Sequence, residues 1–197
     1  MIFSFTGAQS TGKTTLLKRL HEKNGDYPFE FVPEVTRLVM RDYGVSINED
    51  GDDLTQLLIM TEHVRNIYKY TKNIYQTIDI HMIFDRCALD GIVYSEWLFN
   101  SGKISRECYD ACKLIYEELK DKYDVIFYTS PDGIKLVDDG ERSIDKGFRN
   151  DILELFDLYM TGPGRVGAEL VELKGNVEER LKTIKSTLAK HDIDIKI

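Results

Sequence analysis

Eight residues near the N-terminus have the types and spacing that hold phosphate groups. Residues 7–14 read Gly-Ala-Gln-Ser-Thr-Gly-Lys-Thr, which matches the pattern G-x-x-x-x-G-K-S/T. Glycines let backbone N–H groups turn toward phosphate oxygens, and a following helix adds the positive end of its dipole. We expect Lys13 to reach the β- and γ-phosphates of a nucleoside triphosphate and Thr14 to ligate Mg²⁺. With Thr15, the predicted cofactor-binding residues are Gly7, Ala8, Gln9, Ser10, Thr11, Gly12, Lys13, Thr14 and Thr15.

An acidic and a basic residue follow the apolar run that ends at Phe84. A carboxylate at the end of a buried strand can hold Mg²⁺ or its water beside bound phosphates, so we assign Asp85 to the metal and to catalysis. The alternative is that Asp85 caps the helix that follows. Arg86 either points into the same cleft, where it would bind substrate and act in catalysis, or lies on the surface.

Glu34 follows a second short apolar strand, at residues 29–32, and Pro33. In a parallel sheet it would lie near the phosphate-binding loop, where it could accept a proton from an attacking hydroxyl and bind the substrate. The alternative is a glutamate that favours a helix start through the helix dipole. Arg37 comes one helical turn later and would bind substrate or pair with Glu34.

A polar segment at residues 138–149 has the composition of a lid. It carries glycines and three cations between a predicted strand and a predicted helix. Arg142 or Arg149 could close on the γ-phosphate and stabilise negative charge in the transition state. The alternative is a solvated loop of mixed charge.

The elements that must position these residues alternate between strand and helix. Apolar runs predict strands at 1–6, 29–32, 80–84, 124–129 and 168–173, and helical periodicity predicts helices at 12–22, 35–44, 54–76, 88–99, 104–122, 151–160 and 176–190. Residues 45–53 are expected to form a loop and 192–197 a tail. This alternation predicts an α/β fold, in which a parallel five-stranded sheet is covered by helices on both faces. Ligands of such sheets bind beyond the carboxyl ends of the strands, where every residue named above falls.

Length and composition limit the classes of function. The 197 residues suit a single domain spanning 1–197, and the net charge of −8 opposes broad binding to nucleic acid. No run approaches the ~20 apolar residues of a membrane span, and no signal peptide is evident, so we expect a cytoplasmic protein without a membrane partner. The three cysteines form no C-x-x-C pair and are expected to be reduced.

The motifs, in this order, resemble those of the P-loop kinases of nucleosides and nucleotides. The resemblance rests on Phe5–Leu16, Pro33-Glu34, Phe84–Arg86 with Asp90 and Tyr94, and Asp139–Arg142. It covers most of the chain and is greatest for deoxynucleoside and thymidylate kinases and for nicotinamide riboside kinase-type domains, including small phage-encoded members.

This resemblance implies an ATP- and Mg²⁺-dependent enzyme with a P-loop three-layer fold. It places a general base at Glu34, an acid–arginine pair at Asp85 and Arg86, and lid arginines at Arg142 and Arg149. It makes Gln56 the candidate for reading a base, and it places residues 174–176 beside the adenine. The aromatic residues that could line the acceptor site or belong to the core are Tyr43, Tyr68, Tyr94 and Trp97.

The leading hypothesis is therefore transfer of the γ-phosphoryl group of ATP to a nucleoside or nucleoside monophosphate. A second is a P-loop ATPase or regulatory module without a small acceptor. A guanine-specific switch is disfavoured because the fourth strand ends Tyr-Thr-Ser-Pro-Asp and lacks the guanine-binding pattern. A third is a kinase that acts on a modified base or a terminus of a polynucleotide, which the negative charge disfavours. A homodimer is left open.

Overall fold

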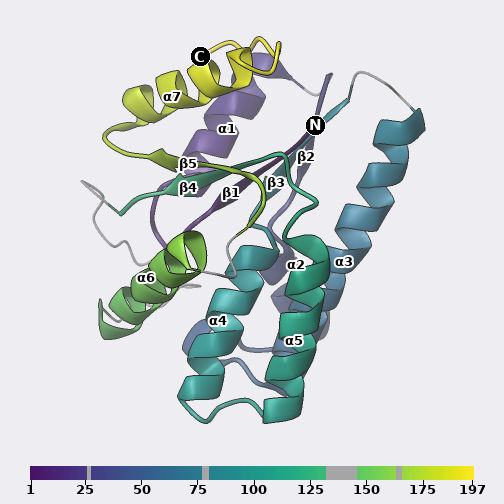
Figure 1. The fold of residues 1–197 in the computed structure, drawn as a ribbon, viewed down its shortest axis with the longest axis vertical. Helices are drawn as coiled ribbons and strands as arrows, with labels where there is room; N and C mark the ends of the chain where they lie inside the picture. Colours follow the sequence, from purple (N-terminus) through teal and green to yellow (C-terminus); the bar gives the residue numbers. More distant parts are fainter. Residues whose placement is uncertain (26–27, 77–79, 132–145, 163–165) are drawn as a thin grey trace.

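Five parallel strands form the centre of the molecule in the computed structural model, which describes residues 1–25, 28–76, 80–131, 146–162 and 166–197 (Figure 1). The strand order is β2-β3-β1-β4-β5, and every neighbouring pair is parallel. The predicted α/β fold with a five-stranded parallel sheet is thus confirmed. The strands are β1 (Ile2–Thr6), β2 (Phe29–Val32), β3 (His81–Asp85), β4 (Val125–Thr129) and β5 (Glu169–Leu173).

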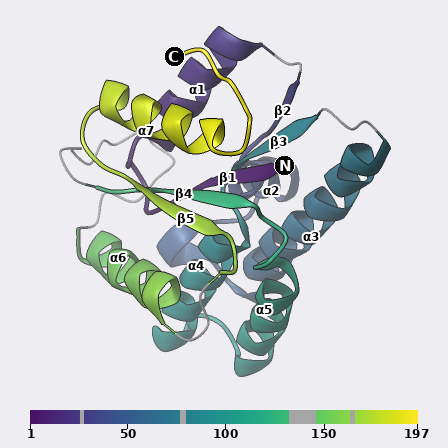
Figure 2. The same cartoon turned by 45° about the horizontal axis from the view of Figure 1, so that its top comes forward.

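Two helices from opposite ends of the chain cover one face of the sheet. They are α1 (Lys13–Asn24) and α7 (Val177–Ala189), which lie together in both views (Figure 2). Their apolar side chains pack with Phe3, Phe5 and Phe127 of the central strands in one buried cluster. This packing brings the C-terminal helix next to the helix that starts at Lys13, within the phosphate-binding motif.

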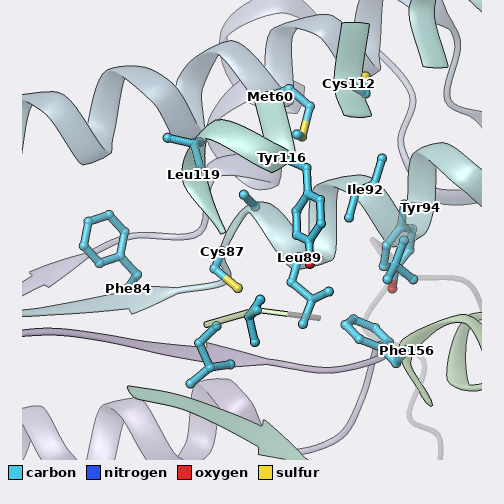
Figure 3. Close-up of a cluster of buried hydrophobic side chains, with 14 of the residues drawn as sticks. Met60, Phe84, Cys87, Leu89, Ile92, Tyr94, Cys112, Tyr116, Leu119 and Phe156 are labelled. Carbon is cyan, nitrogen blue, oxygen red and sulfur yellow. The ribbon is translucent and has the colours of Figure 1, made fainter. Parts of the chain in front are cut away.

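The other face is covered by a larger group of helices. These are α3 (Asp53–Gln76), α4 (Ala88–Asn100), α5 (Arg106–Leu119) and α6 (Lys146–Thr161). Tyr116, Leu89 and Ile92 fill the space between the sheet and these helices (Figure 3). Because every residue from Ala88 to Ser95 is buried, the start of α4 is firmly placed relative to β3.

The shortest of the described α-helices, α2 (Val35–Tyr43), begins three residues after the end of β2 and packs on α3 through Val35, Val39 and Ile59. Between α2 and α3 the predicted loop contains a single 3₁₀ turn, Asn48–Asp50. The pair α2 and α3 therefore forms a wall beside the β2–β3 side of the sheet.

One expectation about an element boundary was wrong. The helix predicted at 151–160 begins at Lys146, so the last four residues of the predicted lid, 146–149, are helical. Phe148, Ile152 and Phe156 are four residues apart and all buried, which is a helical repeat. The polar residues around Phe148 make this repeat hard to recognise in the sequence. The tail after α7 forms no helix or strand, and its Ile193 and Ile195 are buried against the α1–α7 side of the sheet. Residues 138–145, including Arg142, lie outside the described residues.

Candidate active site

The predicted phosphate-binding motif forms the turn between β1 and α1. Gly7 and Gly12 have φ values of +133° and +88°, and Ser10 also has a positive φ, of 55°. A Cβ atom on Gly7 would lie 2.7 Å from Thr129 Oγ1 and 2.9 Å from the Thr129 carbonyl oxygen. Both conformation and space thus demand glycine at position 7, and the loop is pressed tightly against the end of β4.

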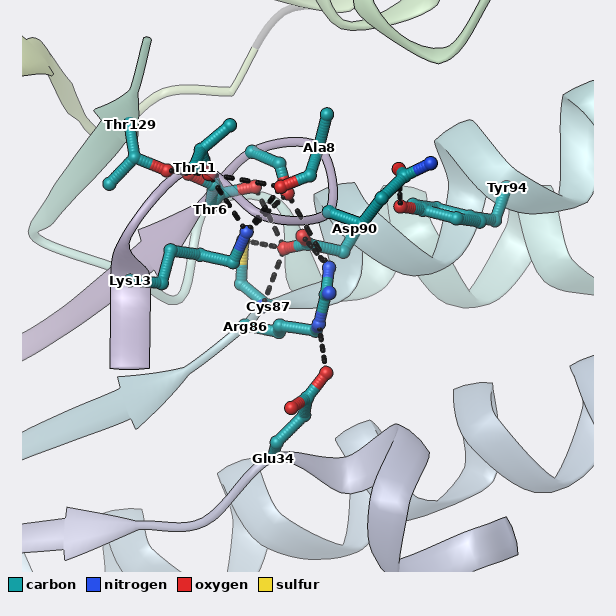
Figure 4. A network of polar contacts seen from close by, with 12 residues as sticks. Thr6, Ala8, Thr11, Lys13, Glu34, Arg86, Cys87, Asp90, Tyr94 and Thr129 are labelled. Atoms are coloured by element: carbon teal, nitrogen blue, oxygen red, sulfur yellow. Dashed lines mark hydrogen bonds and ion pairs between the residues drawn. The ribbon is translucent and has the colours of Figure 1, made fainter. Parts of the chain in front are cut away.

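Lys13 lies inside this loop rather than on the surface of α1. Its Nζ donates hydrogen bonds to the carbonyl oxygens of Gly7 and Ala8, at 2.6 and 2.7 Å (Figure 4). Burial and the nearby Arg86 cation lower the pKa of Lys13 to about 7. The ammonium group is therefore held at the centre of the loop, where an anion would restore its full charge.

A buried ion-pair network lies next to Lys13. Arg86, only 6% exposed, donates from Nε to Glu34 Oε1 at 2.5 Å and from Nη1 to Asp90 Oδ1 at 2.9 Å. Figure 4 shows Arg86 between these two carboxylates, with Lys13 on the far side of Asp90. The surface interpretation of Arg86 is therefore wrong. One guanidinium group connects the end of β3 to the start of α2 and the first turn of α4.

Asp90 is the most highly connected carboxylate of this network. Besides Arg86, its oxygens accept hydrogen bonds from Thr6 Oγ1 at 2.7 Å and from the Cys87 backbone N–H at 3.0 Å. Asp90 is thus the third residue of the capping box that starts α4, and Cys87 is its N-cap. The alternative role of Asp85 as helix cap is therefore wrong, because the helix starts three residues later.

Asp85 has the properties expected of a cation ligand. Burial and the like charge of Glu34 raise its pKa to about 6. Within the described ranges, neither the Asp85 carboxylate nor the Thr14 hydroxyl makes a hydrogen bond or an ion pair. These two oxygen donors fit Mg²⁺, which is commonly held by one or two protein groups together with phosphates and water. No cluster of three or more His, Cys, Asp or Glu residues placed to hold a metal occurs in the described chain.

Glu34 occupies the N-cap position of α2, but its side chain does not cap the helix. Its second oxygen, Oε2, accepts a hydrogen bond from Arg37 Nε at 2.9 Å. The side chain of Glu34 is 8% exposed, that of Arg86 7% and that of Arg37 41%. Glu34 thus has one buried and one accessible partner, and the predicted pairing with Arg37 is confirmed.

A cavity opens beside Glu34, between α2, α3 and α4. Gln56, which is 2% exposed, lies in its wall with its Oε1 accepting a hydrogen bond from Ser95 Oγ at 3.0 Å. His63 lies in the same wall, and burial lowers its pKa to about 4, so its imidazole is neutral at pH 7. The cavity combines these polar groups with apolar walls and is lined by Glu34, Thr36, Arg37, Ile47, Asn48, Gln56, Ile59, His63, Arg86, Asp90, Gly91 and Tyr94.

Not every predicted site residue is brought together. Thr15 is exposed on α1 and lies outside the loop. Of the aromatic residues, Tyr94 lines the cavity, whereas Tyr43 and Tyr68 are 57% and 45% exposed and belong to neither cavity nor core. Trp97 is partly buried against the core of the α3–α6 side.

Arg149 lies in the first turn of α6, and its Nε and Nη2 are buried without a hydrogen-bond partner among the described residues. Burial lowers its pKa, with Tyr128 and Tyr94 nearby. Arg149 as a whole is half-buried, and buried nitrogen donors without a partner are costly, so this arrangement suits a negatively charged ligand.

Three residues of this site were not predicted from the sequence to have a chemical role. Thr129 donates to the Thr6 carbonyl oxygen and contacts Thr11 Oγ1, at 2.9 and 2.6 Å. His63 follows Gln56 by seven residues, two helical turns along the same face, and that spacing was the available signal. Arg180, in the last helix, gave no local signal at all.

A comparison with known protein families identifies the family of this chain. A family model described as AAA domain matches residues 2–180, which include every residue of the site described above. The chain belongs to this AAA-domain family. The match starts in β1 and ends in α7, so it includes all five strands of the sheet.

A search of curated proteins gives no match. None of the described helices is long and apolar enough to cross a bilayer.

Several solved structures share this AAA domain's fold at low sequence identity. The NadR protein, solved in complex with NR, has a TM-score of 0.66 and 15% identity over 100% of this chain and 53% of its own. The chain thus spans about half the length of NadR. Thymidylate kinase from Candida albicans gives 0.65 and 15% over 99% and 96% of the two chains. Deoxyadenosine kinase from M. mycoides, solved with dCMP and dCDP, gives 0.61 and 14% over 97% and 100%. The protein is thus a P-loop AAA domain whose fold resembles those of a thymidylate kinase and a deoxyadenosine kinase.

Proposed function

We propose that this protein transfers the γ-phosphoryl group of ATP to a hydroxyl group of a nucleoside or nucleoside monophosphate. The observation that carries the proposal is the position of Glu34. Its carboxylate lines a cavity, and the Arg86 and Asp90 pair connects it to the Lys13 loop. An acceptor in this cavity would meet a γ-phosphate held by the loop.

On the donor side, backbone N–H groups of Gly7–Thr14 would surround the phosphates. Lys13 would exchange its hydrogen bonds to the Gly7 and Ala8 carbonyl oxygens for bonds to phosphate oxygens. The phosphate charge would raise the pKa of Lys13 from about 7 and hold it protonated. Thr14 and Asp85 would hold Mg²⁺, which neutralises charge that develops on the transferred group.

On the acceptor side, both oxygens of Glu34 are already engaged by arginines. The bond to Arg86 is buried, whereas Arg37 is 41% exposed and can move away at lower cost. The acceptor hydroxyl would therefore take the place of Arg37 on Oε2, donate its hydrogen bond there and be aimed at the γ-phosphate. Because phosphoryl transfer depends mainly on positioning, a carboxylate held by arginine remains adequate as a base.

Two arginines would complete the site over the transferred group. The unpaired Nε and Nη2 of Arg149 are suited to an anionic ligand at the start of α6. Arg142 stays a predicted second lid residue. The fold shared with thymidylate and deoxyadenosine kinases supports this proposal. The enclosed cavity, most of whose polar lining is buried, disfavours the alternative of a polynucleotide acceptor.

A panel of nucleosides, nucleoside monophosphates and oligonucleotides, incubated with γ-labelled ATP and Mg²⁺, tests the proposal. We expect label on a nucleoside or monophosphate. For that acceptor, Glu34→Gln should reduce transfer by about 100-fold or more, because the amide keeps the shape but cannot take a proton. Affinity for ATP should change little, since Glu34 lies on the acceptor side.

Glu30→Gln is the matched control, because it removes one carboxylate from the preceding strand, β2, outside the cavity. It should leave transfer and ATP affinity unchanged. Release of inorganic phosphate with no labelled acceptor would instead support an ATPase without a small acceptor, and labelled oligonucleotides would support the polynucleotide alternative. Transfer by Glu34→Gln at the wild-type rate would refute the assigned role of Glu34.

A further inference from the structure

Arg180, in the first turns of α7, is the largest fully buried side chain of the described protein, at 1% exposure. Its guanidinium group donates three hydrogen bonds to main-chain carbonyl oxygens in three separate segments. Nη1 bonds to Thr11 at 2.8 Å, Nη2 to Ser130 at 2.8 Å and Nε to Gly175 at 2.9 Å. One side chain thus connects the phosphate-binding loop, the residue after β4 and the turn before α7.

The bond to Thr11 has a consequence for the phosphate-binding loop. In a planar trans peptide the C=O and the following N–H point in opposite directions. When Arg180 holds the Thr11 carbonyl oxygen, it also fixes the direction of the Gly12 N–H on the other side of that peptide. Gly12 lies in the motif that would surround the phosphates, so Arg180 sets the direction of one of its donors from outside the loop.

The bonds to the Gly175 and Ser130 carbonyl oxygens connect Arg180 to two segments that are themselves held in place. The turn before α7 is held by a capping box, in which Asn176 Oδ1 accepts from the Glu179 N–H at 3.1 Å and Glu179 Oε2 accepts from the Asn176 N–H at 2.8 Å. The Ser130 N–H donates to the Leu173 carbonyl oxygen at 3.1 Å, which joins the ends of β4 and β5. Arg180 therefore fixes the loop relative to these strand ends.

Arginine is the side chain suited to this arrangement. Its planar guanidinium group directs five N–H donors outward in fixed directions, whereas the lysine ammonium is a single point charge on a flexible stem. The buried cation also places positive charge next to the loop, at the Thr11 carbonyl group. It would favour binding of an anion there.

We propose that Arg180 is a positioning residue for the donor nucleotide. It orients the Thr11–Gly12 peptide toward the phosphates and holds the turn at Gly175 beside the loop, so that both move as one unit. The proposal rests on phosphate binding by Gly7–Thr14 and is independent of the acceptor.

Binding of ADP and of inorganic tripolyphosphate, each with Mg²⁺, to wild-type protein and to Arg180→Lys tests this proposal by calorimetry. Lysine keeps the charge but cannot reach all three carbonyl groups. We expect both dissociation constants to rise about tenfold or more, as for loss of one charge-assisted hydrogen bond. The loss for tripolyphosphate is the specific sign of a misaligned loop, because that ligand has no base or sugar.

Ile184→Ala is the matched control for a general loss of stability. Ile184 lies on the same helix, is fully buried and packs only into the apolar cluster of the α1–α7 face. Ile184→Ala should lower the melting temperature at least as much as Arg180→Lys does. At a temperature well below unfolding, it should still bind both ligands within about twofold of wild type. Losses of affinity that simply follow the losses of melting temperature in the two variants would overturn the proposal.

A second variant reaches the same contact without changing the buried cation. Gly175 has a φ of +80°, which other residues adopt only with strain, so Gly175→Ala should shift the carbonyl group that Arg180 holds. We expect weaker ADP binding here too, in a protein that folds. If ADP binding is unchanged in Gly175→Ala and in any folded Arg180→Lys, the inference is wrong. If the wild-type protein itself binds neither ligand, phosphate binding by the loop, and with it the proposed function, is wrong.

Discussion

The two sides of the candidate site are built in different ways. The phosphate side, Gly7–Thr14 with Thr129 and Arg180, is held mainly by main-chain groups, so its shape depends on glycine conformations and carbonyl contacts. The acceptor side, formed by Glu34, Arg37, Gln56, Arg86 and Asp90, is held by side chains from β3, α2, α3 and α4. A contiguous motif specifies the loop of the first side, although Thr129 and Arg180 come from distant elements. The second exists only when four separate elements are packed, so the two sides should respond differently to substitution.

The largest expected effect is on the phosphate side. Lys13→Ala should lower the turnover measured with γ-labelled ATP by about 1,000-fold or more, because it removes the cation that would stabilise charge on the transferred group. Lys18→Ala, an exposed position on the same helix, should leave turnover unchanged. Circular dichroism would verify that both variants fold. Near wild-type turnover in Lys13→Ala would show that the loop does not serve catalysis.

On the acceptor side, Arg86→Lys should reduce acceptor phosphorylation by about 100-fold while ADP affinity stays within about threefold. A lysine cannot hold Glu34 and Asp90 at the same time, so Glu34 loses its buried partner. Kinetics and calorimetry on the same preparation separate the two effects. A large loss of ADP affinity with unchanged transfer would mean that Arg86 belongs to the phosphate side and would remove the distinction between the two sides.

Asp85 lies at the boundary between the two sides, and Asp85→Asn should raise the Mg²⁺ concentration for half-maximal rate by about tenfold. The asparagine keeps an oxygen ligand but loses the charge, while the loop amides that would bind phosphate are unchanged. A titration of rate against Mg²⁺ at fixed ATP measures this shift. An unchanged metal dependence would exclude Asp85 as a ligand.

The smallest effect concerns His63, whose pKa of about 4 is well below the usual 6.5 because of burial, with Asp90 and Arg86 as its charged neighbours. A lowered pKa in the folded state means that stability is complete above pH 6.5 and falls as the pH decreases toward 4. Between pH 7 and 5.5 this group should cost about 1 kcal/mol of unfolding free energy. Urea titrations should show that His63→Leu has a weaker dependence over this interval than wild type. Equal slopes would mean that His63 is not buried as a neutral group.

The difference between the two sides also explains which predictions succeeded. The loop, the strands and the sheet could be predicted because strand periodicity and the G-x-x-x-x-G-K-S/T pattern are local. Glu34 and Arg86 could be placed at the site because each lies within two residues of the end of a parallel strand, and all such ends meet at one edge of the sheet. The start of α6 was missed because charged residues hide the repeat of Phe148, Ile152 and Phe156.

By itself, the sequence determined the α/β fold, the phosphate-binding loop and the set of acidic and basic residues at the strand ends, because each depends on residues close together in the chain. Only the tertiary structure decided the partners of those residues. Arg86 is shared by Glu34, 52 positions before it, and Asp90, and Arg180 reaches Thr11 across 169 positions. Contacts over such distances depend on how α2, α4 and α7 pack on the sheet, which no local pattern records. The same packing buried Arg180 where three carbonyl groups hold it and left Thr15 exposed to solvent.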